Sequence, residues 1–412
     1  MTEKECIDYI HSAGRFGKKA GLCNIKALLN SLGNPQRDLK CIHIAGTNGK
    51  GSVSCMLTNI LMESGYKVGM NTSPYIEHFN ERLTINCENI PGDKLVRYTN
   101  LVADAIENTD IRPIEFEIIT AIGFLYFKEE KCDYAVIECG IGGLLDSTNI
   151  IENPSLCVIT RLGLDHTEIL GSTIEDIALQ KAGIIKQNST AVLHPDIKGS
   201  ALKTIEDYAK GKSARVCTTD EDYCIREANL EFTSLSAGGM DITLRLLGAY
   251  QASNAALAVN AARVLGIDDT AISRGIENAR WKCRFELVRP NLVIDGAHNP
   301  DGVAAFRKSV DMYIPPKDRV FVIGMLNDKD FDASAGILSQ LGGTFIVTDV
   351  PSARQTDTMR IYDKIRHYIP DALYEPDYQK AVDRALSLAG EDGFVCVAGS
   401  LYLAGAVRSY MS

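Results

Sequence analysis

Residues 41–52 read Cys-Ile-His-Ile-Ala-Gly-Thr-Asn-Gly-Lys-Gly-Ser, and this stretch decides the fold class of the first half of the chain. Its apolar start, residues 41–45, predicts a buried strand. Residues 52–63 predict a helix that Gly65 ends. Between strand and helix, a glycine-rich turn brings together backbone N–H groups, a helix N-terminus and the Lys50 ammonium. This combination indicates a phosphate-binding loop.

The loop departs from the usual pattern G-x-x-x-x-G-K-[ST] at two positions. Ile44 stands where the first glycine would be, and Gly51 separates Lys50 from Ser52. A plainer interpretation is a glycine-rich turn with a solvated lysine, but turn, lysine, hydroxyl and helix coincide, which favours phosphate binding. Taken alone, the loop indicates a nucleoside triphosphate and leaves kinases, GTPases and ligases open.

Short apolar runs rich in Val and Ile alternate with helical patterns along the chain, which predicts parallel sheets covered on both faces. Predicted strands lie at residues 41–45, 134–138, 156–160, 291–295, 319–323, 344–348 and 393–398, and further helices at 172–185, 300–312 and 402–410. Ser172-Thr-Ile-Glu175 predicts a capping box. The polar, alternating stretch 215–247 predicts antiparallel strands appended to the first sheet. Pro290, just before a new strand, predicts a domain boundary between residues 289 and 290.

Composition narrows the class of protein. The chain has 412 residues, of which 45% are hydrophobic and 23% charged, as in a soluble globular enzyme. A net charge of −10 argues against a general nucleic-acid binder. No apolar run reaches the ~18 residues that a membrane helix needs, and the first residues lack the apolar core of a signal peptide. Twelve cysteines without a C-x-x-C pair predict reduced thiols in the cytoplasm, with Cys139 and Cys157 as packing residues.

Beyond the phosphate loop, short motifs rich in glycine, charged and amide residues occur along nearly the whole chain. They are T-S-P-Y at 72–75, F-N-E-R at 79–82, E-C-G-I-G-G at 138–143, L-D-S-T-N at 145–149, L-D-H-T-E at 164–168, K-A-G-I at 181–184, Q-A-S-N at 251–254, R-F-E at 284–286, D-G-A-H-N-P at 295–300 and G-S-L-Y-L-A-G at 399–405. In this order, and with G-T-N-G-K-G-S at 46–52, they resemble the folylpolyglutamate synthase and dihydrofolate synthase family of the Mur ligase superfamily. Three positions depart from that family: Tyr75 for a frequent histidine, Leu144 for a frequent arginine, and Lys282-Cys283 for Pro-Gly.

The resemblance implies an α/β fold with two domains. Residues 1–289 would form a P-loop NTPase-like Mur ligase central domain, with a mostly parallel sheet and a small antiparallel sheet. Residues 290–412 would form a Rossmann-like glutamate-ligase domain. The implied activity is an ATP-dependent ligase that joins L-glutamate to a folate through an acyl phosphate and releases ADP and phosphate.

The resemblance also implies the site residues. ATP would be bound by Gly46, Thr47, Asn48, Gly49, Lys50, Gly51, Ser52, Asn254, Arg284 and Asp295, and the catalytic residues would be Lys50, His166, Lys181, Asp295 and His298. One or two Mg²⁺ ions would be held by Ser73, Glu138 and His166. Lys181 would be carbamylated by carbon dioxide, and Asp146, His298 and Ser400 would contact the substrates. No organic prosthetic group is expected.

Five of these residues also have a plainer interpretation. Glu138 could form a salt bridge, His166 a cap or core contact, and Lys181 an exposed helical lysine. Asn254 could be an N-cap-like polar residue and Arg284 a surface residue.

Three alternatives to the folate ligase stay open at this point. One is a dihydrofolate synthase, which adds the first glutamate to dihydropteroate, alone or as a second activity. Another is a Mur ligase for a different carboxylate, although the residues before Cys41 are too few for an extra N-terminal domain. The third is a P-loop regulatory ATPase that needs no amino acid. The expected partners are small molecules, without nucleic acid or membrane, and the expected state is a cytoplasmic monomer.

Overall fold

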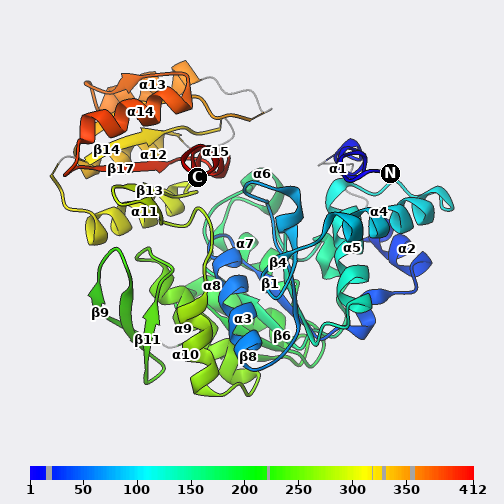
Figure 1. The fold of residues 1–412 in the computed structure, drawn as a ribbon. Helices are drawn as coiled ribbons and strands as arrows, with labels where there is room; N and C mark the ends of the chain where they lie inside the picture. The colour runs from blue at the N-terminus through cyan, green and yellow to red at the C-terminus, as the bar shows by residue number, and fades with distance from the viewer. Residues whose placement is uncertain (15–20, 220–222, 318, 327–330, 353–357) are drawn as a thin grey trace. The chain divides into compact units, whose positions relative to one another are not determined.

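The computed structural model describes residues 1–14, 21–219, 223–317, 319–326, 331–352 and 358–412 (Figure 1). The chain forms two compact units. The first holds Met1–Tyr223, Ala237–Ile242 and Ser253–Ala279, and the second holds Cys224–Ser236, Thr243–Ala252 and Arg280–Ser412. Both units have the α/β architecture that the alternation of strands and helices predicts. The domain boundary between residues 289 and 290 stays a prediction.

The first unit is built on an eight-stranded sheet with the strand order β4-β3-β2-β5-β1-β6-β7-β8. Its strands are β1 (Cys41–Ala45), β2 (Val68–Asn71), β3 (Leu83–Ile85), β4 (Glu88–Asn89), β5 (Tyr134–Glu138), β6 (Leu156–Ile159), β7 (Thr190–Leu193) and β8 (Arg215–Thr218). From β2 to β8 the neighbouring strands run parallel, and β3 and β4 add an antiparallel edge. The carboxyl ends of six strands therefore meet at one edge of this sheet.

Helices cover both faces of the sheet. They are α1 (Glu3–Ser12), α2 (Cys23–Ser31), α3 (Lys50–Glu63), α4 (Gly92–Glu107), α5 (Glu115–Glu129), α6 (Thr167–Leu170), α7 (Ile174–Ala182), α8 (Gly199–Lys210), α9 (Gln251–Val264) and α10 (Asp269–Asn278). Alternate strand residues face opposite layers. Ala135 and Ile137 of β5 pack in a core with α1, α2, α4 and α5. Cys157 and Ile159 of β6 pack in a second core with α7 and α8.

Two local predictions were wrong. The stretch 215–247 does not extend the first sheet with antiparallel strands. Instead β8 joins that sheet parallel to β7, while β9 (Cys224–Ala228), β10 (Thr233–Ala237) and β11 (Met240–Leu244) form a separate three-stranded sheet. The capping box of α7 begins one residue later than predicted, because the Thr173 hydroxyl accepts from the Asp176 N–H and the Asp176 carboxylate accepts from the Thr173 N–H.

The second unit contains a six-stranded sheet with the order β12-β13-β17-β14-β15-β16, in which only the β12–β13 pairing is antiparallel. Its strands are β12 (Glu286–Arg289), β13 (Leu292–Ile294), β14 (Arg319–Ile323), β15 (Thr344–Val347), β16 (Leu373–Tyr374) and β17 (Phe394–Ala398), and its helices are α11 (Pro300–Tyr313), α12 (Phe331–Leu338), α13 (Thr358–Tyr368), α14 (Tyr378–Ala389) and α15 (Leu401–Met411). Helices α11, α12 and α13 share a core with the stacked rings of Phe321 and Phe345. Helix α14 packs on β14 and β17 outside that core.

Among the described residues, no helix combines the length and the apolar character that crossing a membrane requires.

Candidate active site

The predicted residues of the first unit gather where four neighbouring parallel strands end. The strands β2, β5, β1 and β6 lie side by side, and each is followed by one of the sequence motifs. Ser73 follows β2, Glu138 ends β5, the phosphate loop follows β1, and Asp165 and His166 follow β6. Ligands of open parallel sheets bind at such carboxyl edges.

The phosphate loop is fastened to the loop after β6. The backbone N–H groups of Thr47 and Asn48 donate to the Arg161 carbonyl oxygen at 2.9 and 3.2 Å. The Thr160 hydroxyl donates to the Asn48 carbonyl at 2.8 Å. Two of the backbone N–H groups that were expected to donate to phosphate thus donate to a protein carbonyl instead. The predicted role of the whole loop in phosphate binding stays a prediction.

Helix α3 begins at Lys50, two residues before the predicted start. Its N-cap is Gly49, which has a φ of 91° and supplies no capping side chain. A positive φ of this kind suits glycine. Since Gly49 has no side chain that could cap the helix, the partial positive charge at the N-terminus of α3 favours an anion there.

Glu138 connects the phosphate loop to the segment after β2. Its side chain is only 5% exposed, and one carboxylate oxygen lies 3.8 Å from the Lys50 ammonium. The other oxygen accepts the Ser73 N–H at 3.1 Å. The predicted metal ligands Ser73 and Glu138 are therefore neighbours. A hard cation such as Mg²⁺ fits these oxygen donors and would take further ligands from phosphates and water.

No group of three or more His, Cys, Asp or Glu side chains with metal-binding geometry occurs in the part of the chain that the structure covers. His166, the third predicted ligand, is exposed and occupies the N-cap position before α6, with a φ of 52°. Its backbone N–H donates to the side chain of Asp165 at 2.9 Å. The structure places His166 after β6, at the same sheet edge as Glu138 at the end of β5, and its predicted role as a metal ligand stays a prediction.

Lys181 is buried in the last turn of α7, with 4% of its surface exposed. Burial, and next the charge of Lys50, lower the pKa of Lys181 to about 8, while Cys139, Asp146 and Asp165 act in the opposite direction. The charges of the predicted site residues Lys50 and Asp146 thus act on Lys181, whose backbone carbonyl lies beside Gly143. The alternative of an exposed helical lysine is wrong.

Asp146 is buried, and both its oxygens serve the loop that carries it. One oxygen accepts the Ile141 N–H at 2.9 Å, and the other accepts the Thr148 N–H at 3.0 Å and the Thr148 hydroxyl at 2.6 Å. Burial raises the pKa of the Asp146 carboxyl, and these hydrogen bonds oppose the rise. In this structure Asp146 organises the glycine loop after β5, and its predicted role in substrate binding stays a prediction.

A buried histidine, His43, contacts residues at both ends of the glycine loop after β5. The Nε2 of His43 lies 2.8 Å from the Thr148 hydroxyl and 3.2 Å from the Cys139 sulfur. Burial lowers the pKa of His43 to about 3 and raises that of the Cys139 thiol well above its usual value. A neutral ring and a protonated, buried thiol are packing groups, as predicted for Cys139.

Asn254 lies beside the phosphate loop. It is the fourth residue of α9 and is buried, so it is not an N-cap. A Cβ atom at Gly49 would lie 2.6 Å from the Asn254 Oδ1 atom. The Asn254 amide thus lies against the glycine that precedes α3, and its predicted hydrogen bond to adenine stays a prediction.

The second unit gathers its predicted residues at the ends of β13 and β17. Asp295 follows β13, and its carboxylate accepts from the N–H groups of Ala297 and Phe285 and from the Tyr250 hydroxyl, at 2.7, 2.8 and 2.8 Å. Burial raises the pKa of the Asp295 carboxyl, and the Arg284 guanidinium opposes the rise. The contact of Tyr250 with Asp295 could not be predicted from the sequence, because a single tyrosine outside a motif indicates no particular partner.

Two further residues complete this edge of the second unit. The Nδ1 atom of His298 lies 2.9 Å from the Gly296 carbonyl oxygen. Ser400 follows β17, is buried, and caps α15 by accepting the Tyr402 N–H at 3.1 Å. Because the Gly399 N–H donates to the Ala297 carbonyl at 2.9 Å, the loops after β13 and β17 lie side by side.

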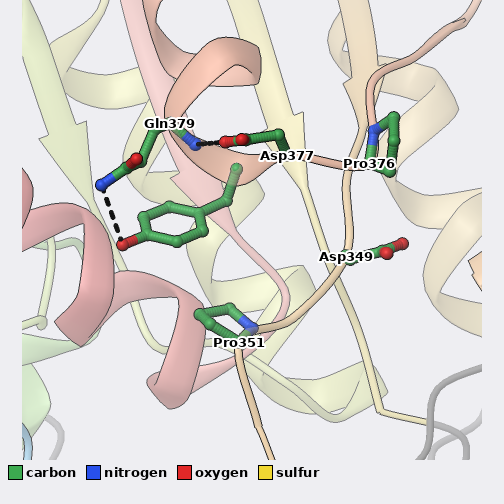
Figure 2. A pocket seen from close by; sticks show the side chains of 6 residues that line it. Asp349, Pro351, Pro376, Asp377 and Gln379 are labelled. Carbon is green, nitrogen blue, oxygen red and sulfur yellow. Dashed lines mark hydrogen bonds between the residues drawn. The ribbon is translucent and has the colours of Figure 1, made fainter.

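A cavity of about 500 Å³ lies elsewhere in the second unit, near the ends of β15 and β16 (Figure 2). Its lining consists of Asp349, Pro351, Pro376, Asp377, Tyr378 and Gln379, and includes no predicted site residue. The Asp377 carboxylate is used to cap α14, where it accepts the N–H groups of Gln379 and Lys380 at 2.9 and 3.2 Å. We therefore place the chemistry at the strand ends described above and not in this cavity.

Comparison with known proteins agrees with this geometry. The Mur ligase middle domain matches residues 44–262, and the Mur ligase glutamate ligase domain matches residues 283–401. The folylpolyglutamate synthase of Lacticaseibacillus casei is 36% identical, with 99% of this chain and 98% of that protein covered. The dihydrofolate synthase/folylpolyglutamate synthase of Bacillus subtilis is 35% identical, with 98% of each covered.

A solved structure agrees over the whole chain as well. The Mycobacterium tuberculosis folylpolyglutamate synthase complexed with ADP and AMPPCP superposes with a TM-score of 0.89 at 27% identity, covering 100% of this chain and 99% of that one. The fold and the site thus define a Mur ligase. Within that class, the chain belongs to the folylpolyglutamate synthase and dihydrofolate synthase family. It is an ATP-dependent ligase that joins glutamate to folates.

Proposed function

We propose that this ligase extends the glutamate chain of a tetrahydrofolate through an acyl phosphate, and that it also accepts dihydropteroate. The observation that carries the proposal is the convergence of Lys50, Glu138 and Lys181 near the start of α3. Such a site can hold the phosphates of ATP against a carboxylate. The double activity is supported by the B. subtilis relative, whose name gives both, and by an E. coli relative solved with DHPP and ADP.

The first step transfers the γ-phosphoryl group. A carboxylate oxygen of the folate attacks the γ-phosphorus in line, the bond to the ADP oxygen breaks, and acyl phosphate and ADP form. The Lys50 ammonium and the N-terminus of α3 stabilise the charge on the moving group. Positioning and electrostatics of this kind account for most of the catalysis of phosphoryl transfer.

The second step forms the amide. The glutamate nitrogen attacks the acyl carbon, phosphate leaves, and the nitrogen loses a proton. In the second unit, we assign Arg284 to the ATP phosphates, and Asp295, His298 and Ser400 to the γ-phosphate or the incoming glutamate. Arg284 suits phosphate because its planar guanidinium donates in a fixed fork. Exclusion of water protects the acyl phosphate.

We assign the Mg²⁺ site to Ser73, Glu138 and His166. Glu138 is a buried carboxylate held by the Ser73 N–H, which makes it a fixed oxygen donor. Bound Mg²⁺ would neutralise charge on the phosphate oxygens. The twelve free cysteines fit a cytoplasmic enzyme, and we expect a monomer.

Lys181 is the candidate for carbamylation. With its pKa lowered to about 8, a sizeable part of the amine is neutral near physiological pH. The neutral nitrogen can attack the carbon of carbon dioxide, an electron pair moves to oxygen, and the nitrogen releases a proton. The product is an anionic carbamate close to Lys50, where a negative charge is stabilised.

Labelling with ¹³C carbon dioxide tests this assignment. We expect one protected carbamate resonance in the wild type, absent from Lys181→Met and kept in Lys203→Met, which alters an exposed lysine of α8. At fixed dissolved carbon dioxide, the labelled fraction should rise as the pH rises through about 8, because the neutral amine increases. Equal spectra for the wild type and Lys181→Met would refute carbamylation at Lys181.

The proposed function itself is tested by substrate dependence. We expect ADP release from ATP to require a pteroyl acid and glutamate together, and the products to contain a new amide bond detectable by mass spectrometry. Tetrahydrofolate and dihydropteroate should both serve as the acid. If dihydropteroate fails, the activity is limited to chain extension. ADP release that is indifferent to both co-substrates would instead support a regulatory ATPase.

A further inference from the structure

The glycine loop after β5 and the end of α7 are in direct backbone contact. The Leu144 N–H donates to the Gln180 carbonyl at 2.8 Å. A Cβ atom at Gly143 would lie 2.6 Å from the Gln180 carbonyl oxygen, and one at Gly183 would lie 2.4 Å from the Leu144 Cα atom. Only glycine permits so close an approach on both sides. The segment that follows Glu138 and the turn that carries Lys181 therefore meet without side chains between them.

Asn149 joins the same two segments through its side chain. Its Nδ2 donates to the Leu144 carbonyl at 2.9 Å and to the Gly183 carbonyl at 3.2 Å. Its Oδ1 accepts from the Lys186 ammonium at 2.7 Å, and that ammonium also donates to the Asn149 carbonyl at 3.2 Å. Because an ammonium can only donate and a carbonyl can only accept, this network fixes the orientation of the amide.

The Asn149 amide lies where it can fix the Lys181 turn relative to the Glu138 loop. Asn149 is buried, with 7% of its surface exposed. Leu144 belongs to the loop that starts at Glu138, and Gly183 lies two residues after Lys181. The Asn149 amide thus connects the backbone of the glycine loop to the backbone of the turn after α7. Both of its donors and its acceptor are engaged. None of its three bonds reaches the phosphate loop.

We propose that Asn149 is a positioning residue that holds Lys181 in register with Glu138 by tying the end of α7 to the glycine loop. The inference rests on the proposed role of Lys181. Lys186 supports the amide, and the two bonds from Nδ2 carry the function. A displacement of about 1 Å at a reacting centre can cost ~10²-fold in rate, so the loss of these bonds is expected to reach the chemical step.

The test is a double-mutant cycle between Asn149→Ala and Lys181→Ala. We expect Asn149→Ala to lower kcat about 10- to 100-fold with little change in the KM for ATP. In the Lys181→Ala background, the same substitution should change kcat less than about twofold, because residues that act as a unit are not additive. Thermal unfolding of each variant, measured in parallel, ensures that kcat is compared for folded protein.

Three further variants separate the bonds. Asn149→Asp keeps an acceptor for Lys186 but loses both donors, so its kcat should be as low as that of Asn149→Ala. Lys186→Met leaves the two bonds from Nδ2 in place, so its kcat should exceed those of Asn149→Asp and Asn149→Ala. Asn260→Ala is the matched control, because the Asn260 amide also bonds a carbonyl of another element, that of Thr218 at 3.1 Å, and its kcat should match the wild type.

The outcomes distinguish the inference from the function on which it rests. If Lys181→Ala is impaired but Asn149→Ala costs the same factor in both backgrounds, Asn149 has only a structural role and the inference is overturned alone. If the kcat of Asn149→Ala equals that of the wild type, the inference is likewise overturned alone. If Lys181→Ala is fully active, both the proposed role of Lys181 and the inference fall.

Discussion

Replacing Lys50 by alanine is expected to lower glutamate-dependent ADP formation about 10²- to 10³-fold, the usual cost of removing one preorganised electrostatic group. The Lys50 ammonium lies 3.8 Å from the Glu138 carboxylate and donates to the Thr47 carbonyl at 3.3 Å, so it is held over the phosphate loop. The loss should appear in kcat, because the charge that Lys50 offsets develops during phosphoryl transfer.

The fold should survive this change, because alanine is a good helix former and Glu138 keeps its bond from the Ser73 N–H. Rates of ADP formation and thermal unfolding curves, measured on the same preparation, separate the two effects. Lys50→Arg should recover part of the activity by restoring the charge. Lys203→Ala removes an exposed lysine of α8 and should behave as the wild type. Normal turnover by folded Lys50→Ala would exclude the loop from the mechanism.

The sequence predicted three strands with the bounds that the structure shows, because their residues are buried on both faces, but it did not predict β2 or β7. The predicted bounds 41–45, 134–138 and 319–323 equal those of β1, β5 and β14. Such strands in parallel sheets are continuous apolar runs, and flanking helices give them clear ends. The roles of the site residues came from the family resemblance, and the structure adds that Ser73, Glu138 and His166 follow or end neighbouring parallel strands.

Features that depend on packing could not be predicted in this way. The helical spacing around Lys181 suggested an exposed lysine, yet the residue is 4% exposed, and the backbone at this end of α7 packs closely against Gly143 and Leu144. Asp146 offered a carboxylate for substrate in the sequence, but its own loop occupies both oxygens. Arg161 was missed because it acts through its backbone carbonyl, which every residue type has.

Replacing Glu138 by glutamine is expected to lower kcat about 10²-fold and to raise the Mg²⁺ concentration needed for half-maximal activity at least about tenfold. Glutamine keeps the volume of the side chain and can still accept the Ser73 N–H, so the substitution removes mainly a negative charge. That charge now faces the Lys50 ammonium and, in the proposed complex, Mg²⁺. Titration of ADP formation with Mg²⁺, at saturating ATP and co-substrates, measures both effects.

Glu117→Gln is the matched control for this experiment. Glu117 is also a buried glutamate, 5% exposed against 4% for Glu138, and its carboxylate also accepts a backbone N–H, that of Ile114 at 2.9 Å. It caps the start of α5, so its substitution should lower the unfolding temperature and leave the Mg²⁺ dependence unchanged. An identical Mg²⁺ titration for Glu138→Gln and the wild type would show that Glu138 serves Lys50 alone. The metal would then have to be assigned to other residues at this sheet edge.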